Sequence, residues 1–581
     1  MNKTLKTLPL YAFITLLALV FGGIFAGQVL GFLRLYTPAA AILLTLAVAV
    51  AACWLYIRSG GLTFLQSITS TDDEADKPSL LEIALYAAGL ILLVLLILLP
   101  VLRWPASPIA TSLEWDAGAY HFPKAIELYA TGSAWDFTIS YGEYPFGYES
   151  LLALGLSTTG SEALFGLVHG LINLTLVLSL WLLARRYTQL PGGFLFFLTN
   201  LLVLSGMLPV ESNLWWVFHP LLYTVGKNDL FLGAALLAAL LHAPVGRKAN
   251  QAQFHPAGLA ITSMIALSIK PNALYGIGFL WLLVLIRWRQ EAGNLISAMR
   301  NHWKTLLFSG LTMLGGLLWI PRNLIAQGSL FSPGVMEVQS WSIAANLNNP
   351  FFYNYIPRNL LVLTAVLVLF IALTAIKRPR RLSWSLAAAF FVLFVSFLFT
   401  PATAFFVHRD VPTQIAWRFA VALLGFAYLA LLTIVSPLVE IVYVWVSSKR
   451  LTRLAALLVI AALTFSVVWF QRDVLPAAPE NARLLRDPYQ ETVGVDGYHS
   501  AYDFAQQNIR NSVVWVENGL PYYAYDKTFT NTTTRSEKAQ YVIVLKSEGQ
   551  DLFPEQVYTD EWEGNWQIIY EDPQGRVYER K

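Results

Sequence analysis

A polar segment at residues 114–149 holds the side chains best suited to chemistry in an otherwise apolar part of the chain. Asp116, near its start, can act as a general base, because an ionised carboxylate accepts a proton from an attacking hydroxyl group. A helix N-cap is the other interpretation of this residue, since aspartate often precedes the first turn of a helix. We predict the catalytic role for Asp116 and interpret residues 114–149 as the catalytic segment.

Four further side chains of this segment are candidates for binding a substrate. Tyr120 and His121 follow Asp116 closely, although on an α-helix His121 would be rotated from Asp116 by about 140°. His121 could bind a phosphate or a metal ion, or be a hydrogen-bonded structural histidine. Glu143 and Glu149 bracket a short sequence with proline and glycine that is typical of a turn. Either glutamate could orient an acceptor or bind a cation, or be an ordinary residue of a membrane interface.

The composition of the chain indicates what kind of protein positions these side chains. Hydrophobic residues make up 56% and charged residues only 13% of the 581 residues, and the mean hydropathy is +0.54. These values are typical of a polytopic membrane protein and exclude an ordinary soluble one. The sequence has no basic cluster of the kind that a nucleic-acid partner would need. Cys53 is the only cysteine, which excludes a disulfide framework.

Apolar runs divide most of the chain into candidate transmembrane helices. About thirteen of them approach the length that spans about 30 Å of hydrocarbon. They lie at 9–31, 38–57, 80–101, 163–184, 191–210, 225–243, 256–270, 272–288, 305–321, 359–376, 383–400, 415–446 and 454–471. The sequence therefore predicts a polytopic α-helical membrane protein with about thirteen transmembrane helices.

The basic residues between these runs predict their orientation. With the amino terminus in the cytoplasm, the basic clusters all lie on the cytoplasmic side, as the positive-inside rule requires. The clusters are Arg185 and Arg186, Arg247 and Lys248, Arg287 and Arg289, Lys377 to Arg381, and Lys449 to Arg453. The same count places 102–162, 322–358, 401–414 and 472–581 on the extracytoplasmic side. The chemically useful residues are thus expected at one face of the membrane.

Three regions follow from this pattern. Residues 1–79 are expected to form two additional N-terminal helices and a cytoplasmic linker, and residues 80–471 the membrane domain with the catalytic segment. Residues 472–581 have the composition of a soluble domain, which predicts an extracytoplasmic α/β domain. Its expected elements are a helix at 498–510, strands at 512–517 and 541–545, and a C-terminal hairpin at 566–578.

Four separated patches carry a pattern that is similar to a known enzyme family. They read WDAGAYHFPKAIELYATGS (115–133), GKNDLFLGAALLAAL (226–240), LSIKPNALYG (267–276) and WIPRNLIAQGSLFSPG (319–334), and a weaker fifth lies at 414–425. Together they resemble the membrane glycosyltransferases with the GT-C fold, which include the protein O-mannosyltransferases and the bacterial aminoarabinose transferases.

The resemblance implies an inverting glycosyltransferase that moves a sugar from a polyprenyl-phosphate donor to an extracytoplasmic glycolipid, polysaccharide or protein. Asp116 matches the acidic catalytic residue of the family, whereas Ala117 stands where members often carry a second acid. The resemblance implies no certain cofactor and leaves a divalent metal ion open. A bacterial inner membrane is the expected location, with an endoplasmic reticulum membrane as the alternative.

A phosphate that leaves such a donor needs cationic side chains around it. Lys270 lies between two apolar runs, where its charge is costly unless it reaches water or meets an anion. Arg322 and Arg418 lie at outer ends of predicted helices, and a guanidinium can bind phosphate oxygens with two hydrogen bonds. We predict that these three residues bind the donor phosphate, with membrane anchoring as the alternative. Secondary candidates for substrate binding are Lys227, Asp229, His408 and Arg409.

Other kinds of protein are alternatives to this interpretation. A polymerase or ligase of lipid-linked oligosaccharides would also work at the outer face and hold a diphosphate with arginines. A transporter or a noncatalytic assembly protein would not depend on Asp116, and a transporter would carry ionisable residues near helix midpoints. The ionisable residues gather at one predicted face instead, which favours the glycosyltransferase.

Overall fold

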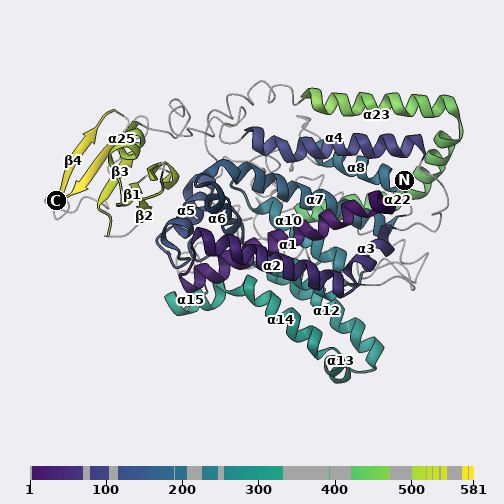
Figure 1. Cartoon of the computed structure of the whole chain (residues 1–581), viewed down its shortest axis with the longest axis horizontal. Helices are drawn as coiled ribbons and strands as arrows, with labels where there is room; N and C mark the ends of the chain where they lie inside the picture. Colours follow the sequence, from purple (N-terminus) through teal and green to yellow (C-terminus); the bar gives the residue numbers. More distant parts are fainter. Residues whose placement is uncertain are drawn as a thin grey trace, which may run out of the picture.

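The computed structural model describes most of the chain. The described residues are 3–69, 79–103, 116–139, 141–188, 190–205, 225–245, 254–330, 391–392, 421–470, 500–517, 520–526, 528–534, 538–545, 565–573 and 575–581. Helices dominate these ranges as far as residue 470, and a small sheet follows in the last part of the chain (Figure 1).

The helical body is built largely from apolar helices that run along the long axis of the molecule (Figure 1). Its helices outside residues 116–164 are α1 (Lys3–Leu33), α2 (Pro38–Arg58), α3 (Gly61–Thr69), α4 (Leu80–Arg103), α7 (Phe165–Tyr187), α8 (Gly192–Ser205), α10 (Asp229–His242), α11 (Pro256–Leu267), α12 (Ala273–Ala292), α13 (Leu295–Asn301), α14 (Trp303–Leu317), α15 (Trp319–Gln327), α22 (Val421–Ser448) and α23 (Arg450–Phe470).

Five helices in the described ranges are long and apolar enough to cross a membrane, and the bent pair α14 and α15 would make a sixth. The five spans lie in α1, α2, α4, α7 with the turn before it, and α23. The chain is thus mostly helical with candidate membrane spans, as its composition predicts. The number thirteen stays a prediction, because the runs at 359–376 and 383–400 lie outside the described residues except for 391–392.

Two helices predicted as spans are shorter than the roughly 20 residues that cross a bilayer upright. α10 has 14 residues and α11 has 12. Every residue of α10 is buried, as expected for a helix that is apolar on all sides. Because α10 begins at Asp229, this polar residue lies at the end of a helix enclosed by the bundle.

The predicted catalytic segment is mostly helical rather than a loop. We call residues 116–164 the outer segment. It contains the π-helix η1 (Ala117–His121), α5 (Phe122–Thr131), α6 (Gly147–Thr159) and the 3-10 turn η2 (Glu162–Leu164). Glycines in the left-handed conformation, Gly132 and Gly160, end α5 and α6, which is where a residue without a side chain fits best.

The C-terminal region contains the expected small sheet. Two of its strands, β1 (Val513–Glu517) and β3 (Tyr541–Leu545), pair in parallel, and β4 (Trp566–Glu571) and β5 (Gly575–Arg580) form the predicted antiparallel hairpin. The sheet order is β2-β1-β3-β5-β4. Elements outside these strands are the helix α25 (Ser500–Asn508), the 3-10 turn η5 (Pro521–Ala524) and the short strand β2 (Thr532–Thr533), of which the last two were not predicted.

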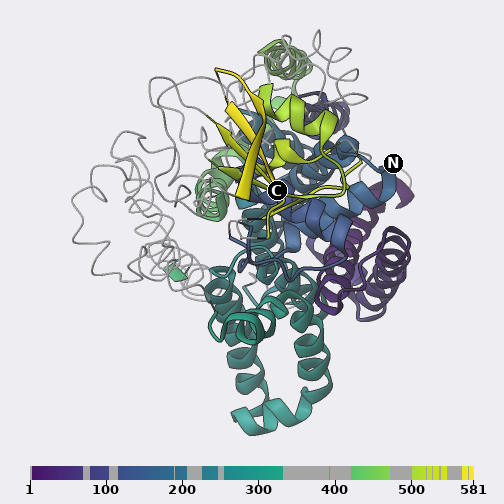
Figure 2. The ribbon, with the colours of Figure 1, turned by 90° about the vertical axis from the view of Figure 1, so that its left-hand side faces the viewer.

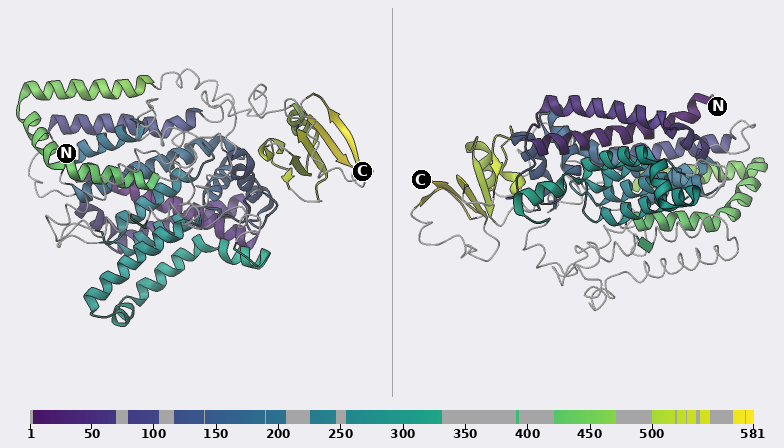
Figure 3. Two further views of the ribbon diagram at one scale, coloured as in Figure 1. Left: turned by 180° about the vertical axis from the view of Figure 1, so that it is seen from behind. Right: turned by 90° about the horizontal axis from the view of Figure 1, so that it is seen from below.

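The polar elements gather at one end of the long axis. In Figure 1 the C-terminal sheet lies next to α5, and α6 and α15 lie at the same end. The N-terminus and α3 lie toward the opposite end in Figure 1, and both views of Figure 3 keep the two termini at opposite ends. In Figure 2 the helices α12 and α14, joined by α13, project away from the body. The C-terminal sheet, α5, α6 and α15 thus lie together at one end of the molecule, and the side of a membrane that this end faces stays a prediction.

Hydrogen bonds join the C-terminal domain to the outer segment. The Tyr525 hydroxyl donates to Oε1 of Glu127 at 2.8 Å, and the backbone N–H of Thr533 donates to the same oxygen at 2.7 Å. Burial raises the pKa of Glu127 to about 8, helped by the nearby Asp136 carboxylate, although the two hydrogen bonds act against this shift. Glu127 is therefore mostly uncharged at neutral pH.

The stability of this interface is expected to depend on pH through Glu127. An exposed Glu127 has a pKa of 4.5, so between pH 4.5 and 8 the unfolded chain is ionised while the folded chain holds a proton. The free energy of unfolding therefore falls as pH rises through this window, by at most about 1.4 kcal/mol per pH unit, and levels off above it. Thermal unfolding of wild type and Glu127→Gln between pH 4 and 9 isolates this contribution, because glutamine keeps the acceptor oxygen and cannot ionise. Parallel pH curves for the two proteins would contradict it.

Candidate functional site

Four segments that are far apart in the sequence meet at the outer end of the bundle. The backbone N–H of Gly147 donates to the Ser268 carbonyl at 2.7 Å, which joins the start of α6 to the turn between α11 and α12. The N–H of Gly226 donates to the Tyr148 hydroxyl at 2.9 Å. A Cβ atom added to Gly226 would lie 2.2 Å from Cβ of Ala117, and its φ is +99°. Only glycine fits there, so the start of α10 lies directly against η1.

Asp116 stands immediately before η1, and its carboxylate lies beside a lysine. Its side chain makes no capping hydrogen bond to the helix, so the N-cap interpretation is wrong. The Oδ2 atom lies 3.8 Å from Nζ of Lys227, and the two side chains are 13% and 12% exposed. A carboxylate that is only partly exposed and next to a cation can stay ionised and still reach a bound molecule. The position is therefore compatible with the predicted base.

The π-helical turn changes the expected relation between Asp116 and His121. The N–H of Phe122 bonds to the carbonyl of Ala117, five residues back. The α-helical geometry assumed from the sequence is thus incorrect for residues 117–121. A π-turn holds more residues than an α-helical turn, so positions five apart come closer to the same face. Such turns occur frequently at functional sites.

His121 belongs to a buried cluster of ionisable groups with Glu149 and Lys124. Its Nδ1 lies 2.7 Å from Oε1 of Glu149, and Nζ of Lys124 lies 3.7 Å from the same oxygen. Burial lowers the pKa of Lys124 to about 8, although the Glu149 carboxylate acts against this shift. Burial also tends to raise the pKa of Glu149, but Lys124 and His121 outweigh it and hold that pKa below its usual value.

The ionised Glu149 fixes the role of the histidine ring. Because a carboxylate accepts hydrogen bonds, Nδ1 of His121 is the donor in this contact, and a neutral ring then presents Nε2 as an acceptor. His121 is thus a hydrogen-bonded histidine, as one of its two interpretations holds, and its ligand-binding role stays a prediction. Lys124 was not among the predicted residues. The only signal for it was a lysine within an otherwise largely apolar helical pattern.

Lys270 and Asp229 form a second ion pair. Nζ of Lys270 donates a hydrogen bond to Oδ1 of Asp229, across the starts of α12 and α10. Asp229 is 2% exposed and Lys270 is 15% exposed. Each charge stabilises the other, because a charge left unpaired in such buried surroundings would lower the stability of the fold. The sequence identified both residues but not their pairing, and their role toward a phosphate stays a prediction.

The two ion pairs are linked through the start of α10. Lys227 pairs with Asp116 and Asp229 pairs with Lys270, and only Asn228 separates the two α10-side partners. The result is an array of two carboxylates and two ammonium groups at one location. Such an array can accept a proton at one point and balance a new negative charge at another.

Arg322 lies on α15, and its described contacts hold the loop before α6. The guanidinium donates to the carbonyls of Ala134 at 3.0 Å, Gly142 at 2.8 Å and Tyr144 at 3.2 Å. Its side chain is buried, and it lies 4.8 Å from the centre of the Phe146 ring. These contacts give Arg322 a structural role. Its binding of a phosphate stays a prediction.

Asn323, the next residue on α15, also holds the backbone of this loop, at Glu143. The side-chain amide of Asn323 donates to the Glu143 carbonyl at 2.7 Å and to the Leu330 carbonyl at 2.7 Å. Glu143 itself is buried. Asn323 was not among the predicted residues, although it lies in a quoted patch. The pair Arg322 and Asn323 therefore fixes the backbone of residues 142–144.

Tyr120 takes part in a group of tyrosine rings next to His121. Its ring centre lies 4.2 Å from that of His121 and 4.9 Å from that of Tyr141, which lies 5.2 Å from that of Tyr144. All three tyrosines are partly exposed. The remaining predicted residues, Arg418, His408 and Arg409, lie outside the described residues.

Among the described residues, no group of three or more histidine, cysteine, aspartate or glutamate side chains is placed to hold a metal ion. The question of a divalent metal therefore stays as the sequence left it. No protein-family model matches the chain, and the comparison with curated proteins finds no matching sequence. The resemblance carried by the sequence patches accordingly stays a prediction.

The ion pair of Lys270 and Asp229 makes a testable contribution to stability. Lys270→Met removes the ammonium partner of a buried carboxylate, and we expect the free energy of unfolding to fall by about 3 kcal/mol. Adding Asp229→Leu should recover most of that loss, because neither charge then remains. Thermal unfolding of the wild type, both single variants and the double variant in the same micelles measures the coupling. Additive losses in the double variant would contradict the pairing.

The bracing by Arg322 is also testable. Lysine keeps the charge of arginine but lacks the planar fork, so Arg322→Lys loses several hydrogen bonds to backbone carbonyls. We expect amide hydrogen exchange of residues 134–145 to rise by at least about tenfold. Arg287→Lys is the matched control, because Arg287 forms an exposed ion pair with Glu291 on α12, where little change is expected. Equal exchange in both variants would show that Arg322 does not hold the loop.

Proposed function

We propose that this protein is an inverting glycosyltransferase that moves a sugar from a polyprenyl-phosphate donor to an acceptor hydroxyl at the extracytoplasmic face. The observation that carries the proposal is the partly exposed Asp116 carboxylate, 3.8 Å from Lys227, at the end of a bundle of apolar helices. A lipid-linked donor enters from the membrane and a polar acceptor from water, so such an enzyme needs a base at that boundary.

The chemistry assigns a part to each charge of the array. Asp116 accepts the proton of the acceptor hydroxyl, whose oxygen attacks the anomeric carbon while the bond from that carbon to the phosphate oxygen breaks. The sugar passes through a state with oxocarbenium character, and a single displacement inverts the anomeric configuration. Lys227 and Lys270 compensate the negative charge that develops on the departing phosphate. The lysines are already balanced by carboxylates, which keeps the array neutral before the donor binds.

The tyrosine rings next to His121 support the proposal of a sugar substrate. Tyr120, Tyr141 and Tyr144 are partly exposed, and their neighbouring ring centres lie 4.9 and 5.2 Å apart. An aromatic ring with a polar hydroxyl suits a ligand that has one apolar face and many hydroxyl groups. We propose that these rings form the platform for the transferred sugar, beside the base that activates its acceptor.

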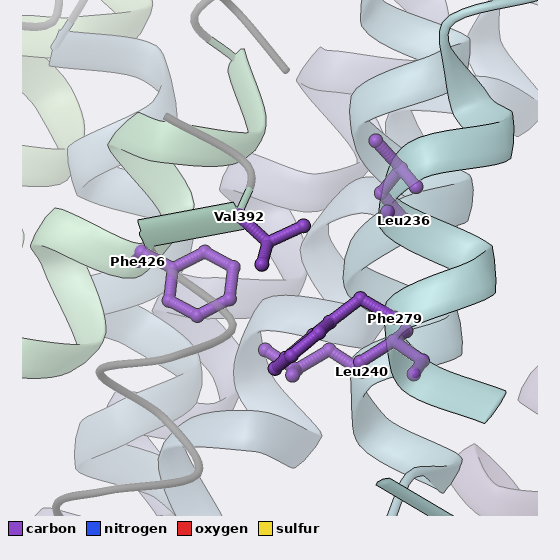
Figure 4. Close-up of a pocket in the computed structure, with 7 residues that line it drawn as sticks. Leu236, Leu240, Phe279, Val392 and Phe426 are labelled. Atoms are coloured by element: carbon purple, nitrogen blue, oxygen red, sulfur yellow. The ribbon is translucent and has the colours of Figure 1, made fainter. Parts of the chain in front are cut away.

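A small apolar pocket lies farther along α10 from Asp229. It lies between α10, α12 and α22, and its lining includes Leu236, Leu240, Phe279 and Phe426 (Figure 4). Leu236 and Leu240 follow Asp229 by 7 and 11 residues, a spacing that repeats along one face of a helix. We propose this pocket as a contact for the isoprenoid chain of the donor.

The proposal includes a location and an orientation. The amino terminus is cytoplasmic, and the site and the C-terminal domain are extracytoplasmic, in a bacterial inner membrane. The collection of the outer segment, α15 and the C-terminal sheet at one end of the molecule supports this orientation (Figure 1). The partners are a polyprenyl-phosphate sugar, membrane lipid and a glycan, glycolipid or protein acceptor.

Asp116→Asn tests the proposal directly. Asparagine keeps the size of the side chain and removes the base, so we expect kcat to fall by about 10²- to 10⁴-fold while donor binding persists. The assay measures sugar release from a panel of labelled polyprenyl-phosphate sugars by purified protein in lipid nanodiscs. Glu291→Gln is the control, because Glu291 is an exposed carboxylate at the end of α12 away from the site.

Two results would count against the proposal. Transfer by Asp116→Asn at the wild-type rate would remove Asp116 from the chemistry. Wild-type protein that binds none of the phosphate-linked donors but binds a diphosphate-linked oligosaccharide would favour the polymerase or ligase instead.

A further inference from the structure

The C-terminal domain contacts the outer segment through tyrosine and threonine residues. We call residues 521–525, with the sequence PYYAY, the docking segment. The Tyr522 hydroxyl donates to Oε1 of Glu162 at 2.9 Å, and the Tyr525 hydroxyl donates to Oε1 of Glu127 at 2.8 Å. Both tyrosines and both glutamates are buried. The docking segment thus forms hydrogen bonds with two elements of the outer segment, α5 and η2.

One contact of the docking segment reaches the π-turn that holds the proposed base and histidine. The Tyr522 ring centre lies 5.2 Å from that of Phe122, whose ring also lies 5.0 Å from that of Phe165 on α7. Phe122 directly follows His121, and its N–H closes the π-turn onto Ala117. Tyr522 therefore packs on the very residue whose backbone completes η1.

A second contact fixes the helix that continues from η1. Oε1 of Glu127 on α5 accepts hydrogen bonds from Tyr525 of the docking segment and from the N–H of Thr533 on β2. The hydroxyl groups of Thr534 and Thr138 lie 3.1 Å apart nearby. Because Glu127 is fully buried by these partners, α5 cannot rotate about its axis without leaving polar groups unpaired.

The π-turn needs such support. A π-helix is rare and occurs mostly as a single turn, because its backbone geometry is less favourable than that of an α-helix. Unfavourable backbone geometry persists where the surrounding structure holds it in place. On one side η1 packs against Gly226 before α10, and on the other side Phe122 packs against Tyr522.

We infer that the docking segment of the C-terminal domain is a positioning element of the catalytic turn: Tyr522 and Tyr525 hold Phe122 and α5 so that Asp116 and His121 keep their places. The catalytic role of this turn rests on the proposed function. The contacts that hold η1 and α5 in place do not depend on it. The two tyrosines contact Phe122, Glu162 and Glu127. Their effect on the reaction passes through Phe122 and Glu127.

The test uses the full chain in lipid nanodiscs with Tyr522→Ala, Tyr522→Phe and the control Tyr541→Ala. Tyr522→Ala removes the ring on Phe122, whereas Tyr522→Phe keeps the ring and loses only the hydrogen bond to Glu162. Tyr541 lies on β3 with its hydroxyl bonded to Glu579 on β5, so its loss disturbs the same sheet away from the docking segment. Amide hydrogen exchange and transfer kinetics are measured on each protein.

For Tyr522→Ala we expect hydrogen exchange of residues 117–128 to rise at least about tenfold, with exchange in α1 and α7 unchanged. We expect kcat to fall about tenfold with little change in donor KM, since a displaced base slows the chemical step. Tyr522→Phe should restore exchange at residues 117–122 and most of kcat, and Tyr541→Ala should leave both near wild type.

Two results would overturn the inference. Wild-type exchange at residues 117–128 in Tyr522→Ala would show that the contact does not hold the turn. A rise spread equally over α1, α7 and α10 would show that Tyr522 stabilises the whole fold rather than positions one segment. If the wild-type protein transfers no sugar from any donor, the proposed function fails, while the exchange data still decide the positioning role.

Discussion

The outer end of this protein depends on one constraint, which is that a charge removed from water must be paired. Asp229 at the first residue of the buried helix α10 would be costly there without Lys270. The pair therefore ties α10 to the turn before α12, and Asp116 with Lys227 ties the outer segment to the same place. The candidate site thus forms where charged side chains near the helix ends pair with one another.

Two further elements hold the outer segment around this array. Arg322 from α15 fixes the backbone before α6 with hydrogen bonds to carbonyl groups, and the C-terminal domain bonds to Glu127 on α5. Both contacts use buried polar groups, which have well-defined geometry because each lost bond is costly. Asp116 and Tyr120, which belong to the outer segment, stay partly exposed. The more rigid the surroundings, the less freedom a base has to leave its working position.

A neutral array at the start of α10, with an apolar pocket farther along the same helix, supports the proposal of a ligand that is both anionic and lipid-linked. The two ammonium groups balance two carboxylates, so the array by itself has no net charge. In the proposed reaction the same ammonium groups compensate the charge that develops on the departing phosphate.

The sequence by itself determined the helical and apolar character of the chain, the small C-terminal sheet and the identity of the charged residues at the outer end, because these follow from local composition and periodicity. It also identified Asp116, Lys227, Asp229 and Lys270 individually. Only the tertiary structure decided that these residues form two ion pairs, since the partners Asp229 and Lys270 are 41 residues apart and nothing local links them. It alone decided the π-turn and the contact of Tyr525 with Glu127, 398 residues away, because packing between distant segments overrides local preference.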